Sequence, residues 1–167
     1  MRYASIRKFD VTNGEGIGIS LFVQGCHFHC FNCFNPDTWN FNGGHEWTEE
    51  IEKTFLDLLK ANHIKRVTVL GGEPLEEQNL LEIFNLLEKI KNNFPSKRLW
   101  IYSGFTFEEC LKHPLRKKIL SLCDVLVDGR YMDELRDISL PWRGSSNQRV
   151  IDVQKSLQEN RVISWIG

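Results

Sequence analysis

The 167-residue sequence is long enough for one domain with its own core, and its 41% apolar and 26% charged residues are typical of a globular protein. Its formal net charge of −1 gives no electrostatic reason to expect a nucleic acid or a membrane as a partner. The first residues lack the apolar core of a secretion signal, and the apolar runs are too short to cross a bilayer, so we expect a single cytoplasmic domain, 1–167.

Apolar strands and amphipathic helices alternate along the chain. The expected strands lie at 18–25, 65–74, 98–104 and 123–129. The expected helices lie at 48–63, at 76–94 and within 106–121. Thr48 is expected to cap the first helix, because its hydroxyl can accept a hydrogen bond from a free backbone N–H group. The tail, 148–167, is expected to add a strand, a short helix and a second strand.

This alternation predicts the α/β class, with a mostly parallel sheet whose strands are joined by crossover helices. Roughly four or five βα units are too few for a closed eight-stranded barrel. We therefore expect a single-domain, open partial (β/α) barrel, with a doubly wound sheet as the alternative. In either form, the carboxyl ends of the strands carry the chemistry.

Residues that can bind a ligand or take part in a reaction follow each expected strand. The cysteine loop "GCHFHCFNCFNP" follows the first strand, and the turn "GGEP" (71–74) follows the second. Ser103 follows the third strand and Asp128 follows the fourth. Because the carboxyl ends of parallel strands meet at one edge, these segments are expected to form one site.

The cysteine loop places Cys26, Cys30 and Cys33 in C-x3-C-x2-C spacing. A structural zinc ion takes four protein ligands, and an ordinary 4Fe–4S cluster takes four cysteines. His27 or His29 is a candidate for a fourth zinc ligand, although both are crowded within the loop. The two remaining cysteines, Cys110 and Cys123, lie in apolar segments and are expected in the core. Three cysteines would leave one iron of a cluster open to a small molecule.

The loop, with Phe34 beside its third cysteine, resembles the signature of the radical S-adenosylmethionine (radical SAM) enzymes, and the "GGEP" turn is a second match. In that family, three cysteines hold a 4Fe–4S cluster, and the open iron binds the amino and carboxylate groups of SAM. The glycine-rich turn holds the amino group of SAM. The resemblance implies that the metal ligands are Cys26, Cys30 and Cys33, and that the turn residues contacting SAM are Gly71, Gly72 and Glu73.

Further segments, "WIYSGF", "DVLVDGRY" and "RDISLPWRGSSNQRVID", are similar to the glycyl-radical activases of anaerobic ribonucleoside-triphosphate reductases. That resemblance implies reductive cleavage of SAM to a 5′-deoxyadenosyl radical, which removes a hydrogen atom from a glycine of the large reductase subunit. The implied partners are that subunit and an external one-electron donor of the flavodoxin or ferredoxin type. No nucleic acid and no membrane are expected as partners.

The roles of other residues are less sharply indicated. Asn32 and Phe34 flank the third cysteine and are expected to touch SAM, with simple packing as an equal alternative for Phe34. Ser103 and Asp128 are candidate SAM contacts because of their position at strand ends. His27 and His29 are expected to shield the cluster or tune its potential.

The C-terminal segment, 128–167, is a candidate docking region for the partner. Four of its polar residues can bind the carboxylate of SAM or the partner, or can simply be solvated surface. They are Arg130, Arg143, Asn147 and Arg149.

Three other functions remain open on the sequence alone. The first is the activation of another glycyl-radical enzyme such as pyruvate formate-lyase. The second is a radical SAM synthase of the deazaguanine type, acting on a small molecule. The third is a non-catalytic zinc-binding interaction module, which would be colourless and would not bind SAM.

Overall fold

The computed structural model describes residues 1–166, and Gly167, the end of the expected tail strand, lies outside the described residues. The strands are β1 (Arg2–Asp10), β2 (Gly18–Val23), β3 (His45–Glu46), β4 (Arg66–Gly71), β5 (Arg98–Ser103), β6 (Val125–Asp128) and β7 (Arg149–Asp152). The α-helices are α1 (Glu49–Leu58), α2 (Leu80–Asn93), α3 (Phe107–Leu111), α4 (Pro114–Leu122) and α5 (Val153–Glu159). Short 3-10 helices are η1 (Pro36–Thr38), η2 (Glu77–Asn79) and η3 (Asp133–Leu135).

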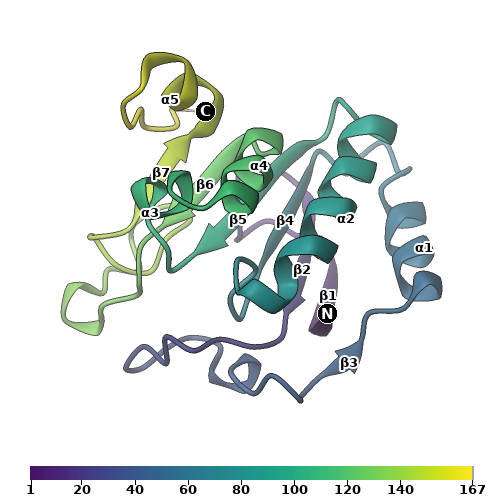
Figure 1. Cartoon of the computed structure of the whole chain (residues 1–167), viewed down its shortest axis with the longest axis horizontal. Coiled ribbons are helices and arrows are strands. Elements are labelled where there is room, and N and C mark those ends of the chain that lie inside the picture. Colours follow the sequence, from purple (N-terminus) through teal and green to yellow (C-terminus); the bar gives the residue numbers. More distant parts are fainter. Residues whose placement is uncertain (167) are drawn as a thin grey trace.

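The strands form one seven-stranded sheet in the order β3-β1-β2-β4-β5-β6-β7 (Figure 1). The four central strands β2, β4, β5 and β6 run parallel to one another, whereas β1, β3 and β7 pair antiparallel at the two sides. Helices connect the parallel strands, as crossover connections require. The α/β class and the open sheet are thus confirmed, and the curvature of a partial barrel stays a prediction.

The first strand was not anticipated from the sequence. β1 carries mostly polar residues, and most of its side chains are only half-buried or are exposed, so it lacks a clear apolar pattern. It pairs with β2 through an irregular register with shifts between Tyr3 and Ser5 and between Arg7 and Asp10. A hairpin partner of this kind is selected by its neighbour rather than by its own composition.

The expected helix at 48–63 and the expected second strand of the tail are both longer than the structure shows. α1 ends at Leu58 rather than near residue 63, since the chain turns there, although the side chain of Thr48 caps its start as predicted and accepts from Ile51 N at 3.2 Å. The second strand of the tail is reduced to a single bridge between Ile151 and Ser164. The left-handed residue Asn160 ends α5 and turns the chain, so that it meets β7 only briefly.

The helices pack on one face of the sheet, where alternate strand residues meet apolar side chains from all five α-helices. Cys110 and Cys123 are fully buried in this core, as predicted. No α-helix within residues 1–166 is long and apolar enough to cross a membrane. Opposite the helices, the sheet is covered instead by loops that bring Trp142 and Trp165 against Trp100.

A buried arginine organises the loop that joins β1 to β2. Arg66, at the start of β4, is fully buried, and its guanidinium donates to Asp10 O at 2.7 Å and to Asn13 O at 3.0 Å. It also donates to the carbonyl oxygens of Glu15 and Gly16, both at 3.3 Å. The loop therefore wraps around the cation and closes over this end of the sheet.

The charge of Arg66 is balanced by Asp10, whose carboxylate lies 3.9 Å away. Burial alone would raise the pKa of Asp10, but hydrogen bonds from Ser20, Thr12 and Asn13 outweigh burial and lower the pKa to about 2. Removing one member of such a buried pair leaves the other uncompensated, which is strongly destabilising.

We therefore expect Asp10→Asn to lower the free energy of unfolding at pH 7 by about 3 kcal/mol, since Arg66 loses its counter-charge. The stabilising effect of an ionised Asp10 is fully present above the ordinary pKa of 3.8 and is lost as the pH falls through about 2, so the variant and the wild type should converge in acid. Urea denaturation across pH measures this.

Asp57→Asn is the matched control, because Asp57 makes an exposed ion pair with Lys60 at 2.9 Å, and such pairs contribute about 0.5 kcal/mol or less. An equally small loss in both variants would contradict the stabilising role of the buried pair.

Candidate functional site

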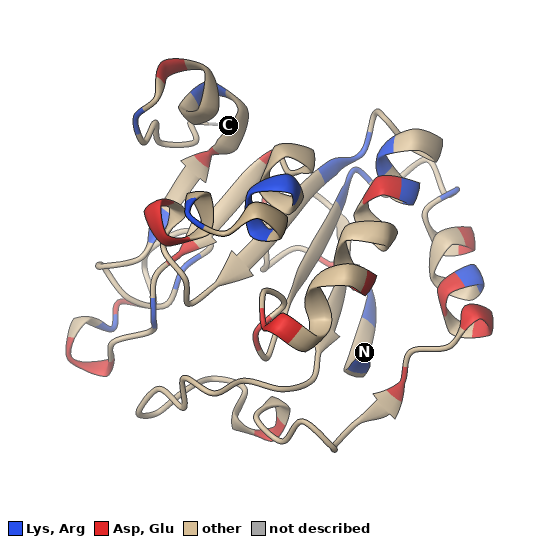
Figure 2. Cartoon of the chain, viewed as in Figure 1, with Lys and Arg blue, Asp and Glu red and all other residues tan. Residues whose placement is uncertain are grey.

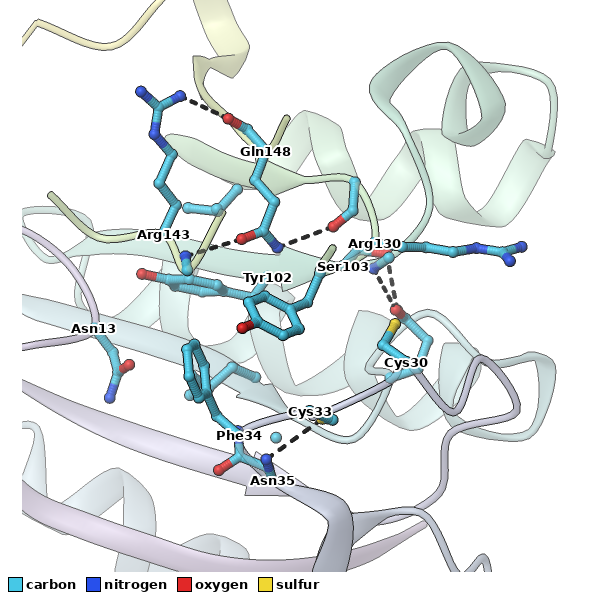
Figure 3. A pocket seen from close by; sticks show the side chains of 18 of the residues that line it. Asn13, Cys30, Cys33, Phe34, Asn35, Tyr102, Ser103, Arg130, Arg143 and Gln148 are labelled. Atoms are coloured by element: carbon cyan, nitrogen blue, oxygen red, sulfur yellow. Dashed lines mark hydrogen bonds between the residues drawn. The ribbon is translucent and has the colours of Figure 1, made fainter. Parts of the chain in front are cut away.

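A cavity of about 540 Å³ lies on the face of the sheet opposite the helices. Its floor is built from Phe22, Leu70, Tyr102 and Val127, one residue from each of the four parallel strands. Figure 3 shows Tyr102 and Phe34 facing the interior, with the cysteine loop at one side. The volume is that of a small-molecule site, and the floor is largely apolar.

The three cysteines of the loop line this cavity, and their thiols are free and half-buried. Backbone bonds pin both ends of the loop: Gly25 N donates to Thr38 O at 2.6 Å, and Cys26 N donates to Trp39 O at 3.1 Å. Cys33 N closes a turn on Cys30 O at 3.1 Å. Within residues 1–166, no three His, Cys, Asp or Glu side chains are grouped to hold a single metal ion.

Burial raises the pKa of the Cys26 thiol to about 11 and also raises that of Cys30. A metal or a cluster must therefore displace protons from these thiols when it binds. The donors are soft, half-buried and on one cavity wall, which suits iron–sulfur chemistry. Cys110 and Cys123 belong to the core on the other face and do not line the cavity, so the loop offers three cysteine ligands and no fourth.

The two loop histidines make other contacts. His27 Nδ1 bonds to the carboxylate of Glu76, and the ring of His29 stacks on Trp39 at 4.5 Å with an interplanar angle of 11°. Neither ring lines the cavity. This arrangement disfavours either histidine as the fourth ligand of a zinc ion.

Gly71 and Gly72 line the cavity where β4 ends. Gly71 has φ of +109°, and a Cβ at this position would lie 2.8 Å from Phe22 Cα. A Cβ on Gly72 would lie 2.6 Å from Gly25 O. The glycines are therefore needed so that the turn can pack against β2 and the cysteine loop, and this packing also brings bare backbone to the cavity wall.

Glu73 is buried and connects the ends of two strands. Its Oε2 accepts from Leu75 N and from Ser103 Oγ, both at 2.8 Å, and its Oε1 accepts from Gly104 N at 2.7 Å. Burial raises the pKa of Glu73 to about 7, although these hydrogen bonds oppose the rise. Glu73 and Ser103 both line the cavity, but their polar atoms are engaged with each other.

The remaining candidates divide into cavity-lining and outside residues. Phe34 lines the cavity, with its ring 4.8 Å from that of Tyr131. Asn32 is exposed and donates to Asp133 Oδ2 at 3.0 Å, outside the cavity lining. Asp128 is buried beside the cavity, where it accepts from Phe107 N at 2.7 Å and from Arg149 at 2.6 and 3.0 Å. Contact of Asn32 or Asp128 with SAM stays a prediction.

The polar residues of the C-terminal segment mostly serve the fold. Arg149 pairs with Asp128 and with Glu108, and Asn147 Nδ2 donates to Arg130 O at 2.7 Å. Arg130 lines the cavity while its guanidinium carbon lies 4.3 Å from the ring centroid of Phe28.

Arg143, which also lines the cavity, donates to Gln148 O at 2.6 Å (Figure 3). Gln148 and Tyr102 also line the cavity and were not predicted from the sequence. Tyr102 could have been predicted, because successive side chains of a strand point to opposite faces of the sheet.

Replacing Glu73 with glutamine tests the buried carboxyl. Because its pKa is raised in the folded protein, the stability it contributes is fully present below its ordinary pKa of 4.5 and is lost as the pH rises through about 7. We expect the unfolding free energy of the cofactor-free wild type to fall over this range more steeply than that of Glu73→Gln, in urea titrations under reducing conditions.

The matched control is Glu88→Gln, since Glu88 is exposed on α2 and should retain the wild-type slope. Identical slopes for all three proteins would show that Glu73 titrates normally and would contradict its buried, bridging role.

Comparison with known proteins agrees with this geometry. A family model described as "4Fe-4S single cluster domain" matches residues 12–151. The chain is 39% identical over 150 residues to the anaerobic ribonucleoside-triphosphate reductase-activating protein of Pasteurella multocida, which covers 89% of this chain and 95% of the relative. Proteins of the same name are 37% identical in Escherichia coli strain K12, over 90% of this chain and 97% of the relative, and 38% identical in Enterobacteria phage T4, over 90% and 93%.

These matches confirm the resemblance to the activating proteins of anaerobic ribonucleoside-triphosphate reductases. The matches span most of this chain and most of each relative, so the similarity is not confined to one motif. The chain belongs to the 4Fe-4S single cluster domain family and to the family of the anaerobic ribonucleoside-triphosphate reductase-activating proteins.

Proposed function

We propose that this chain is a radical SAM activase that generates a glycyl radical on an anaerobic ribonucleoside-triphosphate reductase. The observation that carries the proposal is the presence of Cys26, Cys30 and Cys33 in one loop on the wall of a cavity. The glycine turn after β4 lines the same cavity, and the relatives are named for activating this reductase.

In this proposal, the three cysteines hold a 4Fe–4S cluster, and their loop keeps it at the edge of the cavity. When bound there, the cluster would supply the electron for cleavage of SAM to methionine and a 5′-deoxyadenosyl radical, and this radical would remove a hydrogen atom from the partner's glycine. The chain itself binds and orients SAM: Gly71 and Gly72 bring their backbone to the cavity wall. Phe22 and Leu70 form part of the apolar floor of the same cavity.

Exposed apolar side chains at the edge of the cavity favour a protein as the substrate. Ile138 lines the cavity and is 81% exposed, and Phe34 lines it and is 55% exposed. Apolar side chains left open to solvent around a site are typical of a surface that another protein covers. We therefore propose that the reductase inserts its glycine segment here, and that the C-terminal segment, 128–167, contributes to docking.

The proposed reaction requires an external one-electron donor, of the flavodoxin or ferredoxin type, and free thiols. Both requirements suit the cytoplasm, where thiols remain reduced. No nucleic acid and no membrane enters the proposal.

The ligand assignment predicts that Cys26→Ser, Cys30→Ser and Cys33→Ser each lose most of their iron after anaerobic reconstitution, because a cluster with two cysteine ligands is poorly held. The core variant Cys110→Ala is the control, since this thiol is buried away from the cavity. Iron and sulfide analysis with the visible absorption spectrum measures the result. Full iron content in any of the three loop variants would remove that cysteine from the ligand set.

The activity itself is tested by mixing the reduced, reconstituted protein with SAM and a purified anaerobic ribonucleoside-triphosphate reductase. We expect a glycyl-radical doublet in the electron paramagnetic resonance (EPR) spectrum of the reductase. Replacing the reductase with pyruvate formate-lyase is the specificity control. A doublet with pyruvate formate-lyase alone would reassign the partner, and SAM cleavage without a radical on either protein would indicate a small-molecule substrate.

A further inference from the structure

The cysteine loop is tied to a distant segment of the chain through one carboxylate. Asp133, the first residue of η3, accepts from Asn32 Nδ2 at 3.0 Å and from the hydroxyl of Tyr131 at 2.7 Å. Asn32 immediately precedes Cys33 in the loop. The two hydrogen bonds use different carboxylate oxygens, so Asp133 holds both partners at once.

The residue after Cys33 is held by the same segment. The ring of Phe34 lies 4.8 Å from the ring of Tyr131, and the guanidinium carbon of Arg136 lies 5.5 Å from its centroid. Gly144 also packs against this ring, since a Cβ on Gly144 would come within 2.5 Å of Phe34 Cε2. The Phe34 ring therefore fits here only because position 144 is a glycine.

A second cysteine belongs to the same turn, since Cys33 N donates to Cys30 O at 3.1 Å. The segment around η3 thus contacts both neighbours of Cys33, Asn32 through Asp133 and Phe34 through Tyr131. Asn32 has φ of +55°, a left-handed conformation that asparagine tolerates, so the loop bends sharply at the residue that Asp133 holds.

We infer that Asp133 is a positioning residue that fixes where Cys33 presents its sulfur. This inference rests on the proposed function, in which Cys33 is a cluster ligand. Residues that orient metal ligands from outside the coordination sphere typically change metal affinity by about 10- to 100-fold when they are removed. Asn32 was predicted to touch SAM, and in this structure its side chain donates to Asp133.

The hydrogen bonds that Asp133 accepts from Asn32 and Tyr131 lie near the surface, so they can be removed without disturbing the core. Asn32 is exposed, Asp133 is half-buried, and η3 contains no buried residue. Figure 2 shows acidic residues at the tip of this segment, well away from the helices that cover the sheet. A change at Asp133 should therefore alter the loop and leave global folding intact.

The test compares Asp133→Ala with Asp137→Ala in the reconstituted holoprotein. Asp137 lies in the same segment, but its side chain accepts only from Ser139 among the described residues, so it is the matched control. We expect Asp133→Ala to release iron to a ferrous chelator about tenfold faster than wild type. Its reduced cluster should also show a changed EPR line shape or midpoint potential, and Asp137→Ala should match the wild type in both.

A second pair of variants keeps the test decisive if Asp133→Ala folds poorly. Asn32→Ala and Tyr131→Phe each remove one donor to Asp133, and each should increase the rate of iron release. Asn32→Ala should increase that rate less in an Asp133→Asn background than in the wild type, because the two changes affect the same hydrogen bond. Thermal unfolding of each cofactor-free variant checks that the fold is retained.

Wild-type iron release and spectra in Asp133→Ala, Asn32→Ala and Tyr131→Phe would overturn the inference while leaving the proposed function standing. A wild-type protein that takes up no iron–sulfur cluster would overturn both. The two failures are therefore distinguishable from the first reconstitution.

Discussion

The candidate site depends on the buried carboxyl of Glu73. Its oxygens accept from the backbone of Leu75, from the hydroxyl of Ser103 and from the backbone of Gly104, while its own N–H donates to Gly25 O at 2.8 Å. One residue thereby joins the end of β4, the end of β5 and the start of the cysteine loop. A buried polar group is tolerated only when its hydrogen bonds are satisfied, so these three segments are held in one arrangement.

Buried polar networks connect the segments at both ends of the cavity. At one end, Glu73 joins the strand ends, and at the other, Arg66 and Asp10 fold the β1–β2 loop around a buried charge. Between them lies the floor, where Phe22 and Tyr102 project from neighbouring parts of the sheet. Fixed walls suit the proposed chemistry, because a reactive radical must meet its target and little else. The edge of the cavity, in contrast, carries exposed side chains, and a protein substrate could cover them.

Local patterns in the sequence predicted much of this molecule, and long-range pairing explains what they missed. The parallel strands and their helices follow from apolar periodicity, and Thr48 was identified as a cap from its residue type and position. The three-cysteine loop, together with the "GGEP" turn, carried the resemblance to the radical SAM enzymes. In contrast, Arg66 looks like an ordinary surface cation in the sequence and is fully buried, because its partners come from a loop some fifty residues earlier. The bond between Asn32 and Asp133 spans 101 positions and leaves no local signal.

The central claim is that the three loop cysteines leave one iron of a cluster open to SAM at the edge of this cavity. The most direct measurement is the EPR spectrum of the reconstituted, dithionite-reduced protein with and without SAM, under anaerobic conditions. Our account predicts the signal of a reduced 4Fe–4S cluster whose g-values change when SAM is added. A protein that carries tightly bound zinc, or a cluster whose spectrum does not respond to SAM, would contradict it.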